Sequence, residues 1–60
     1  MFDQLPNDPV MLLSFVNTQL RDHYSDFSAF TDAFEVNPEE IITKLRSIDY
    51  EYDAATNQFI

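Results

Sequence analysis

The sequence predicts a mainly α-helical fold with a small β-hairpin: a three-helix bundle plus a C-terminal hairpin, in a winged-helix-like arrangement. Three observations predict it. Apolar residues recur at spacings of three and four up to residue 48, three helix-start signals divide that stretch, and the residues after it alternate between apolar and polar. A spacing of three and four is typical of one face of an α-helix, and alternation between apolar and polar residues is typical of a half-buried β-strand.

The first helix is expected over residues 9–24. Asp8 supplies a side-chain acceptor for the free N–H groups of the first turn, and Pro9 takes the first helical position, where its missing N–H costs nothing. At about 100° per residue, most apolar side chains gather on one broad face, which we expect to form the core. That face comprises Leu12, Leu13, Val16, Leu20 and Tyr24.

Two further helices are expected over residues 26–35 and 38–48. Asp26 opens the second, and Asn37, followed by a proline, opens the third. Both then show apolar residues at helical spacing, which predicts one buried face for each helix. These residues are Phe27, Phe30, Ala33 and Phe34 in the second helix, and Ile41, Ile42, Leu45 and Ile48 in the third.

Residues 50–60 are expected to form the hairpin, with residues 50–52 and 58–60 as its arms. The chain has no glycine, so we expect Asp49 at the end of the third helix and Asn57 at the end of the hairpin turn to adopt the left-handed conformation, which Asp and Asn tolerate. A lone hairpin is marginal in water, so one of its faces should lie on the helices. The candidates for that contact are Tyr50, Tyr52 and Phe59.

The chain is short and strongly acidic. Its 60 residues form one domain, 1–60, in which residues 1–7 are an N-terminal arm. Eleven Asp and Glu residues stand against three Lys and Arg residues, giving a net charge of −8. Nucleic acids and anionic membranes are bound mainly through clustered Lys and Arg. We therefore expect no membrane partner, and we rank nucleic acid well below a protein partner.

The sequence shows no targeting segment and no membrane span. Its first residues lack the basic and apolar regions of a secretory signal, and no stretch approaches the ~20 apolar residues of a spanning helix. A soluble, cytoplasmic protein is the expectation.

Residues for catalysis or metal binding are scarce. The chain has no cysteine and one histidine, so a single copy contains neither a cysteine nucleophile nor a two-histidine metal site. His23 and Asp26 offer two ligands where a metal needs three or four, and an interaction of His23 with the helix end explains it more simply. We therefore expect no enzyme activity, no cofactor and no metal.

Two segments carry a resemblance to a known family. The stretches "LPNDPVMLLSFVNTQLRD" and "IDYEYDAATNQFI", with the pattern LPNDPVMLLS…LRD…YEYD…NQF, are similar to a family of small uncharacterised bacterial proteins, a domain of unknown function. The similarity covers nearly the whole chain. It implies a common fold and a bacterial origin, and it implies no mechanism.

The order of the expected elements also resembles a winged helix-turn-helix, in which the third helix reads DNA and the hairpin is the wing. The third helix, however, begins with two acids, where phosphate-binding helices leave their N–H groups free. The hairpin adds Glu51 and Asp53 and no cation. The residues that would face a groove are Glu39, Glu40, Thr43, Lys44 and Ser47.

Two apolar residues of the first helix, Met11 and Phe15, lie one turn apart and away from its core face. Either other parts of the chain cover them, namely Phe2 and Leu5 of the N-terminal arm or the hairpin, or they form a surface for self-association or a partner. A methionine beside an aromatic residue suits adaptable apolar recognition.

A polar stripe of Ser14, Asn17 and Arg21 runs beside the core face at spacings of three and four. In one interpretation, Asn17 and Arg21 form a pair one turn apart, and Arg21 also binds an acidic neighbour and hairpin carbonyls. In the other, Arg21 binds a carboxylate or phosphate ligand, since it is one of only three cations.

The leading function hypothesis is a non-catalytic protein-interaction module, which pairs with itself through the first helix or binds a protein partner. Its candidate surface comprises Met11, Phe15, Ser14, Asn17 and Arg21. The alternative is a winged-helix-like, transcription-associated DNA-binding domain.

Overall fold

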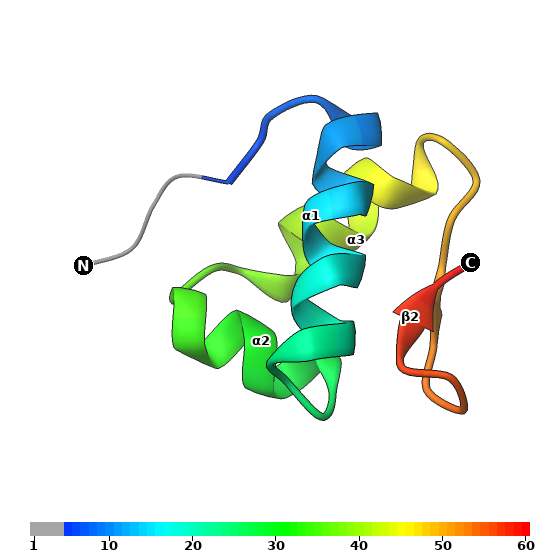
Figure 1. The fold of residues 1–60 in the computed structure, drawn as a ribbon. Helices are drawn as coiled ribbons and strands as arrows, with labels where there is room; N and C mark the ends of the chain where they lie inside the picture. The colour runs from blue at the N-terminus through cyan, green and yellow to red at the C-terminus, as the bar shows by residue number, and fades with distance from the viewer. Residues whose placement is uncertain (1–4) are drawn as a thin grey trace.

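A computed structural model describes residues 5–60 of the chain. It confirms the predicted fold class: three helices followed by a two-stranded antiparallel hairpin (Figure 1). The elements are α1 (Pro9–Asp22), α2 (Phe27–Phe34), α3 (Pro38–Arg46), β1 (Tyr52–Asp53) and β2 (Gln58–Phe59).

Each helix begins at a side chain that the sequence identifies as a cap. A side-chain oxygen of Asp8, Asp26 and Asn37 accepts a backbone N–H of the first turn at 3.0, 2.8 and 3.0 Å, respectively. Such a bond satisfies one of the first-turn donors that have no partner within the helix. The three helix starts therefore follow from local sequence.

The helix ends differ from the expected ranges by one or two residues. Helix α1 ends at Asp22 because the N–H groups of His23 and Tyr24 both bond to the carbonyl of Gln19, at 2.8 and 3.1 Å. Helix α2 ends at Phe34 because Glu35 is left-handed, with a φ of 55°. The strands are only two residues long each, shorter than the expected arms.

Within residues 5–60, three non-glycine residues take the left-handed conformation. Asp49 and Asn57, with φ of 68° and 56°, are the two that the sequence predicts, and Glu35 is a third that it does not. Unlike Asp and Asn, Glu has no short polar side chain that favours the left-handed conformation, so the sequence does not predict this conformation at Glu35.

The core draws apolar residues from all three helices and from β2. Phe30, Phe59 and Leu45 are among the side chains with the least exposure, at 0, 2 and 0%. Leu13, Phe34 and Ile48 are only partly buried and pack around this centre. The buried apolar set is Leu12, Val16, Leu20, Phe27, Phe30, Ile41, Leu45 and Phe59.

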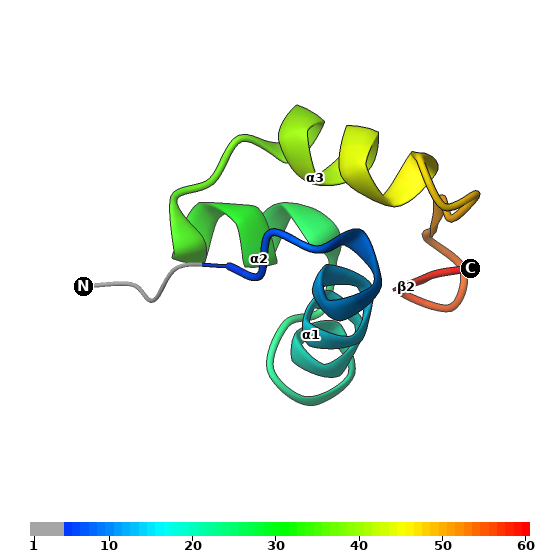
Figure 2. The same ribbon diagram turned by 90° about the horizontal axis from the view of Figure 1, so that it is seen from above.

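Helix α1 is flanked by α2 on one side and by the hairpin on the other, as two views of the ribbon show (Figures 1 and 2). The first turn of α2 nevertheless meets the hairpin, because the ring centroid of Phe27 lies 5.5 Å from that of Tyr52 and 5.1 Å from that of Phe59. One hairpin face thus lies on the helices as predicted, while Tyr50 is exposed.

Asn57 joins the hairpin turn to the end of α1. Its Nδ2 donates to the carbonyl oxygens of Leu20 and Tyr24 at 3.1 and 3.0 Å. Its Oδ1 accepts the hydroxyl of Tyr52 at 2.7 Å, and the same hydroxyl accepts the N–H of Phe27 at 3.3 Å. One turn residue thereby satisfies two carbonyls near the end of α1, which have no partner within the helix.

None of the helices in residues 5–60 combines the length and the apolar character needed to cross a bilayer.

Candidate functional site on α1

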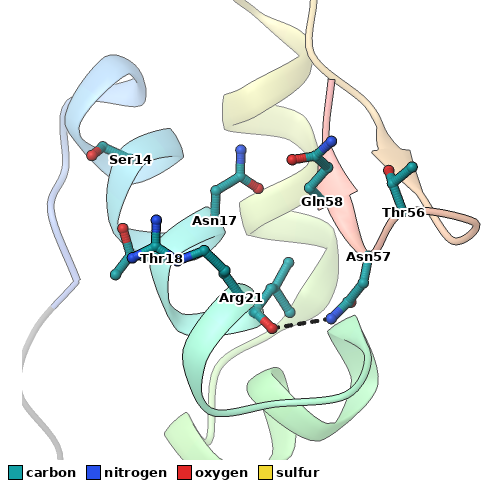
Figure 3. Close-up of a pocket in the computed structure, with 8 residues that line it drawn as sticks. Ser14, Asn17, Thr18, Arg21, Thr56, Asn57 and Gln58 are labelled. Carbon is teal, nitrogen blue, oxygen red and sulfur yellow. Dashed lines mark hydrogen bonds between the residues drawn. The ribbon is translucent and has the colours of Figure 1, made fainter.

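A polar cleft of about 450 Å³ lies between α1 and the end of the hairpin (Figure 3). Three of the five residues of the predicted surface, Ser14, Asn17 and Arg21, line it. Its opposite wall comes from the hairpin turn and β2. The complete lining is Ser14, Asn17, Thr18, Leu20, Arg21, Thr56, Asn57 and Gln58.

Asn17 is bound to β2 through both ends of its carboxamide. Its Nδ2 donates to the carbonyl of Phe59 at 3.1 Å, and its Oδ1 accepts the N–H of Phe59 at 2.8 Å. Glu51 and Ile60 exchange two backbone bonds of 2.9 Å, so the peptide groups of Phe59 face away from β1. Asn17 therefore occupies the position that a third strand would take.

The predicted pairing of Asn17 with Arg21 is wrong, and so is the role of Arg21 in holding the hairpin. Asn17 holds the hairpin, and Arg21 makes a two-point contact with Asp22, with Nε to Oδ1 at 2.9 Å and Nη2 to Oδ2 at 3.0 Å. The sequence misses this because it does not show which strand lies beside Asn17. Spacing alone gives Arg21 as the nearest partner one turn away.

The contact between Arg21 and Asp22 shifts the pKa of both groups. The hydrogen bond from Arg21 lowers the pKa of the Asp22 carboxyl, and the same bond raises the pKa of Arg21. A lowered carboxyl pKa contributes stability at neutral pH that is lost as the pH falls through that pKa. Both side chains are well exposed, so this contribution is small. The positive charge of Arg21 is matched by its neighbour, which weakens the hypothesis of an anion site.

Replacement of Asn17 by alanine is expected to destabilise the fold by about 2 kcal/mol, because two partly buried backbone groups of Phe59 lose their partner. The neighbouring exposed residue gives the control: Thr18→Ala is expected to change the free energy of unfolding by less than about 0.5 kcal/mol. Urea unfolding measures both. Equal effects of the two substitutions would contradict the role assigned to Asn17.

A second, more apolar hollow lies at the N-terminal half of α1 and shares Ser14 and Thr18 with the polar cleft. It measures about 380 Å³ and is lined by Pro6, Met11, Ser14, Phe15 and Thr18. Met11 is 63% exposed, and the adjacent Val10 is 62% exposed. The two hollows together extend along the exposed side of α1.

The structure separates Met11 from Phe15. Met11 is exposed, whereas Phe15 is partly buried against α2, with its ring centroid 6.4 Å from Phe30 and 5.7 Å from Phe34. The Phe15 ring thus packs against α2, a partner that the sequence does not predict. Leu5 does pack against the core, and Phe2 lies outside the described residues.

Several residues of the alternative metal and DNA sites have other partners in the structure. Asp26 caps α2, and within residues 5–60 no group of three His, Cys, Asp or Glu side chains is placed to hold a metal ion. On α3, Lys44 Nζ donates to Asn7 Oδ1 at 2.6 Å, and Arg46 lies 3.9 Å from Glu51. The first turn of α3 carries two exposed glutamates.

These features define a small three-helix domain closed by a hairpin that is attached to α1 through Asn17 and Asn57. Over residues 6–59 the chain matches a family model described as a domain of unknown function, DUF4250, and it belongs to that family. The predicted membership of a domain-of-unknown-function family is thereby confirmed. No curated protein and no solved structure gives a significant match.

Proposed function

We propose that this domain is a non-catalytic protein-interaction module that associates with a second copy through an exposed face of α1. The α1 face consists of Val10, Met11, Ser14 and Thr18, which are the exposed residues of the helix before Arg21. The observation that carries the proposal is the exposure of two adjacent large apolar side chains beside an apolar hollow. Clustered apolar exposure of this kind is characteristic of contact surfaces.

The spacing of the α1 face suits a partner helix. Met11, Ser14 and Thr18 follow one another at intervals of three and four, so they lie along one stripe. Ser14 and Thr18 are small enough to let a second helix approach closely, while Met11 adapts its shape to the partner. The resulting contact would be apolar at the start of α1 and polar toward its end.

The charge distribution favours a second copy on this face over other faces. The net charge is −8, yet no Asp or Glu lies between Asp8 and Asp22. Two copies that meet through α1 would keep their carboxylates apart, whereas contacts through α3 or the hairpin would bring acids together. Long-range repulsion still opposes the dimer, so added salt should strengthen it by screening.

Sedimentation equilibrium tests this proposal with a matched pair of variants. Met11→Asp and Ser28→Asp each add one carboxylate at an exposed position in the first turn of a helix, where negative charge is favourable, so both variants should fold. The parent and Ser28→Asp are expected to dimerise. Met11→Asp is expected to dimerise at least about tenfold more weakly, because a carboxylate is costly in an apolar contact.

Two results would contradict the proposal. The first is a parent that stays monomeric up to millimolar concentration in high salt. The second is a Met11→Asp variant that dimerises as tightly as Ser28→Asp. Circular dichroism of each variant shows whether its helices are intact.

The interaction module is favoured over the DNA-binding domain by the charges on the elements that would meet DNA. The third helix offers exposed acids in its first turn, and its lysine is bonded to Asn7. The hairpin offers Glu51 and Asp53. The cytoplasmic location and the absence of catalysis belong to the same proposal and rest on the sequence.

A further inference from the structure

The outer edge of β1 has backbone groups that the hairpin does not use. Glu51 exchanges two backbone hydrogen bonds with Ile60, and ladder positions alternate, so the N–H and C=O of Tyr52 point away from β2. The Asn17 carboxamide fills the corresponding edge of β2, and no side chain in residues 5–60 does the same for β1. The edge is also held in place, because the Tyr52 hydroxyl is bonded to Asn57.

An acidic hollow lies beside this edge. It measures about 420 Å³ and contains three carboxylates and one cation, Arg46, whose Nε is 3.9 Å from Glu51. Ile60, which is 59% exposed, adds an apolar contact. The lining is Arg46, Asp49, Glu51, Tyr52, Asp53 and Ile60.

We infer that the Tyr52 edge, with the acidic hollow beside it, binds an extended basic peptide by strand addition. The peptide backbone pairs with the N–H and C=O of Tyr52, as in other cases where an extended segment joins a sheet edge. Tyr52 points its side chain to the core, so the side chains of Glu51 and Asp53 lie on the opposite face of the strand. Alternate side chains of the peptide reach that face, where lysine or arginine meets the two carboxylates.

The charges of the hollow exclude a second copy as the occupant. Antiparallel pairing of two β1 edges would bring the same acids together from two chains of net charge −8 each. Like charges at neighbouring positions of a strand pair are destabilising. The peptide site is also separate from the α1 face, since β2 and Asn17 stand between α1 and β1.

The test uses two synthetic eight-residue peptides of equal charge, one of alternating lysine and valine and one of alternating lysine and proline, titrated into the folded chain at low salt. Proline lacks the N–H that strand pairing needs. The lysine-valine peptide is expected to shift the amide signals of Tyr52 and its neighbours and to slow the hydrogen exchange of the Tyr52 amide. The lysine-proline peptide is expected to bind at least about tenfold more weakly.

Two matched variants test whether the carboxylate of Glu51 contributes to peptide binding. Glu51→Gln is expected to weaken the lysine-valine peptide by about threefold or more, and Glu39→Gln, which removes an exposed carboxylate of α3, is expected to leave it unchanged. Equal binding of the two peptides, or equal effects of the two variants, would overturn the inference and leave only diffuse attraction between opposite charges. Met11→Asp should bind the peptide as the parent does, so failure of the α1 proposal and failure of this inference are distinguishable.

Discussion

Replacement of Phe59 by alanine is expected to remove a large part of the free energy of unfolding at 25 °C. The side chain is 2% exposed, and its ring centroid lies 5.1 Å from that of Phe27 and 5.4 Å from that of Tyr52. Truncation of a buried phenylalanine costs about 3–5 kcal/mol. A domain of 60 residues has a total stability of only about 3–9 kcal/mol at typical values per residue. Circular dichroism and urea unfolding measure the loss.

The adjacent residue supplies the control for this substitution. Ile60 is 59% exposed, and Ile60→Ala is expected to change the free energy of unfolding by less than about 0.5 kcal/mol. Phe59→Leu retains much of the buried volume and should fall between the two. A Phe59→Ala variant that unfolds at the same urea concentration as the parent would show that the hairpin is not part of the core.

The substitutions Asn57→Gly and Asn57→Ala are expected to separate two contributions of this turn residue. Glycine tolerates a φ of 56° but loses the bonds to Leu20, Tyr24 and Tyr52, which we expect to cost about 2–3 kcal/mol. Alanine loses the same bonds and adds about 1–2 kcal/mol of left-handed strain. Alanine should therefore be the more destabilising of the two in urea unfolding.

The substitution Asn57→Asp tests the contribution of the side-chain N–H donor separately from that of the acceptor. The aspartate keeps an acceptor for the Tyr52 hydroxyl and tolerates the left-handed conformation, but it presents no N–H to the carbonyls of Leu20 and Tyr24. It should be at least as destabilising as glycine. An Asn57→Gly variant as stable as the parent would contradict the role of the carboxamide. Equal losses of stability in the glycine and alanine variants would contradict the contribution of strain.

The fold class is predictable from this sequence because the signals for each element are local. Asp8 and Asn37, each followed by a proline, mark helix starts whatever the rest of the chain does. The left-handed Asp49 and Asn57 follow from the lack of glycine where a helix and a hairpin turn must end. Glu35 ends α2 in the same conformation without a local signal; the next residue, Val36, packs against the core and donates its N–H to the carbonyl of Thr31.

The contacts that build the site depend on which elements meet, and sequence spacing does not show this. Asn17 bonds to Phe59 across 42 positions, and Asn57 bonds to Leu20 across 37. The polar stripe includes Asn17, but sequence spacing predicts Arg21 as its partner because spacing identifies only neighbours along the helix. Phe15 shows the same limit, since its ring packs against aromatic residues of α2.

The two proposed contacts respond to salt in opposite directions. Dimerisation through the α1 face opposes the repulsion between two chains of charge −8 and should strengthen as salt is added. Binding of a basic peptide at the Tyr52 edge depends on attraction to Glu51 and Asp53 and should weaken. One salt series on each assay therefore tells the two surfaces apart.

Association of two copies through the α1 face can be observed by isotope-filtered NOE spectroscopy on a mixture of copies with ¹³C-labelled methionine methyl groups and unlabelled copies. We expect cross-peaks from the Met11 methyl of one copy to protons of the α1 face of the other, and their loss in Met11→Leu checks the assignment. A dimer that shows no such cross-peaks from Met11, or a sample that remains monomeric under the same conditions, would contradict this association.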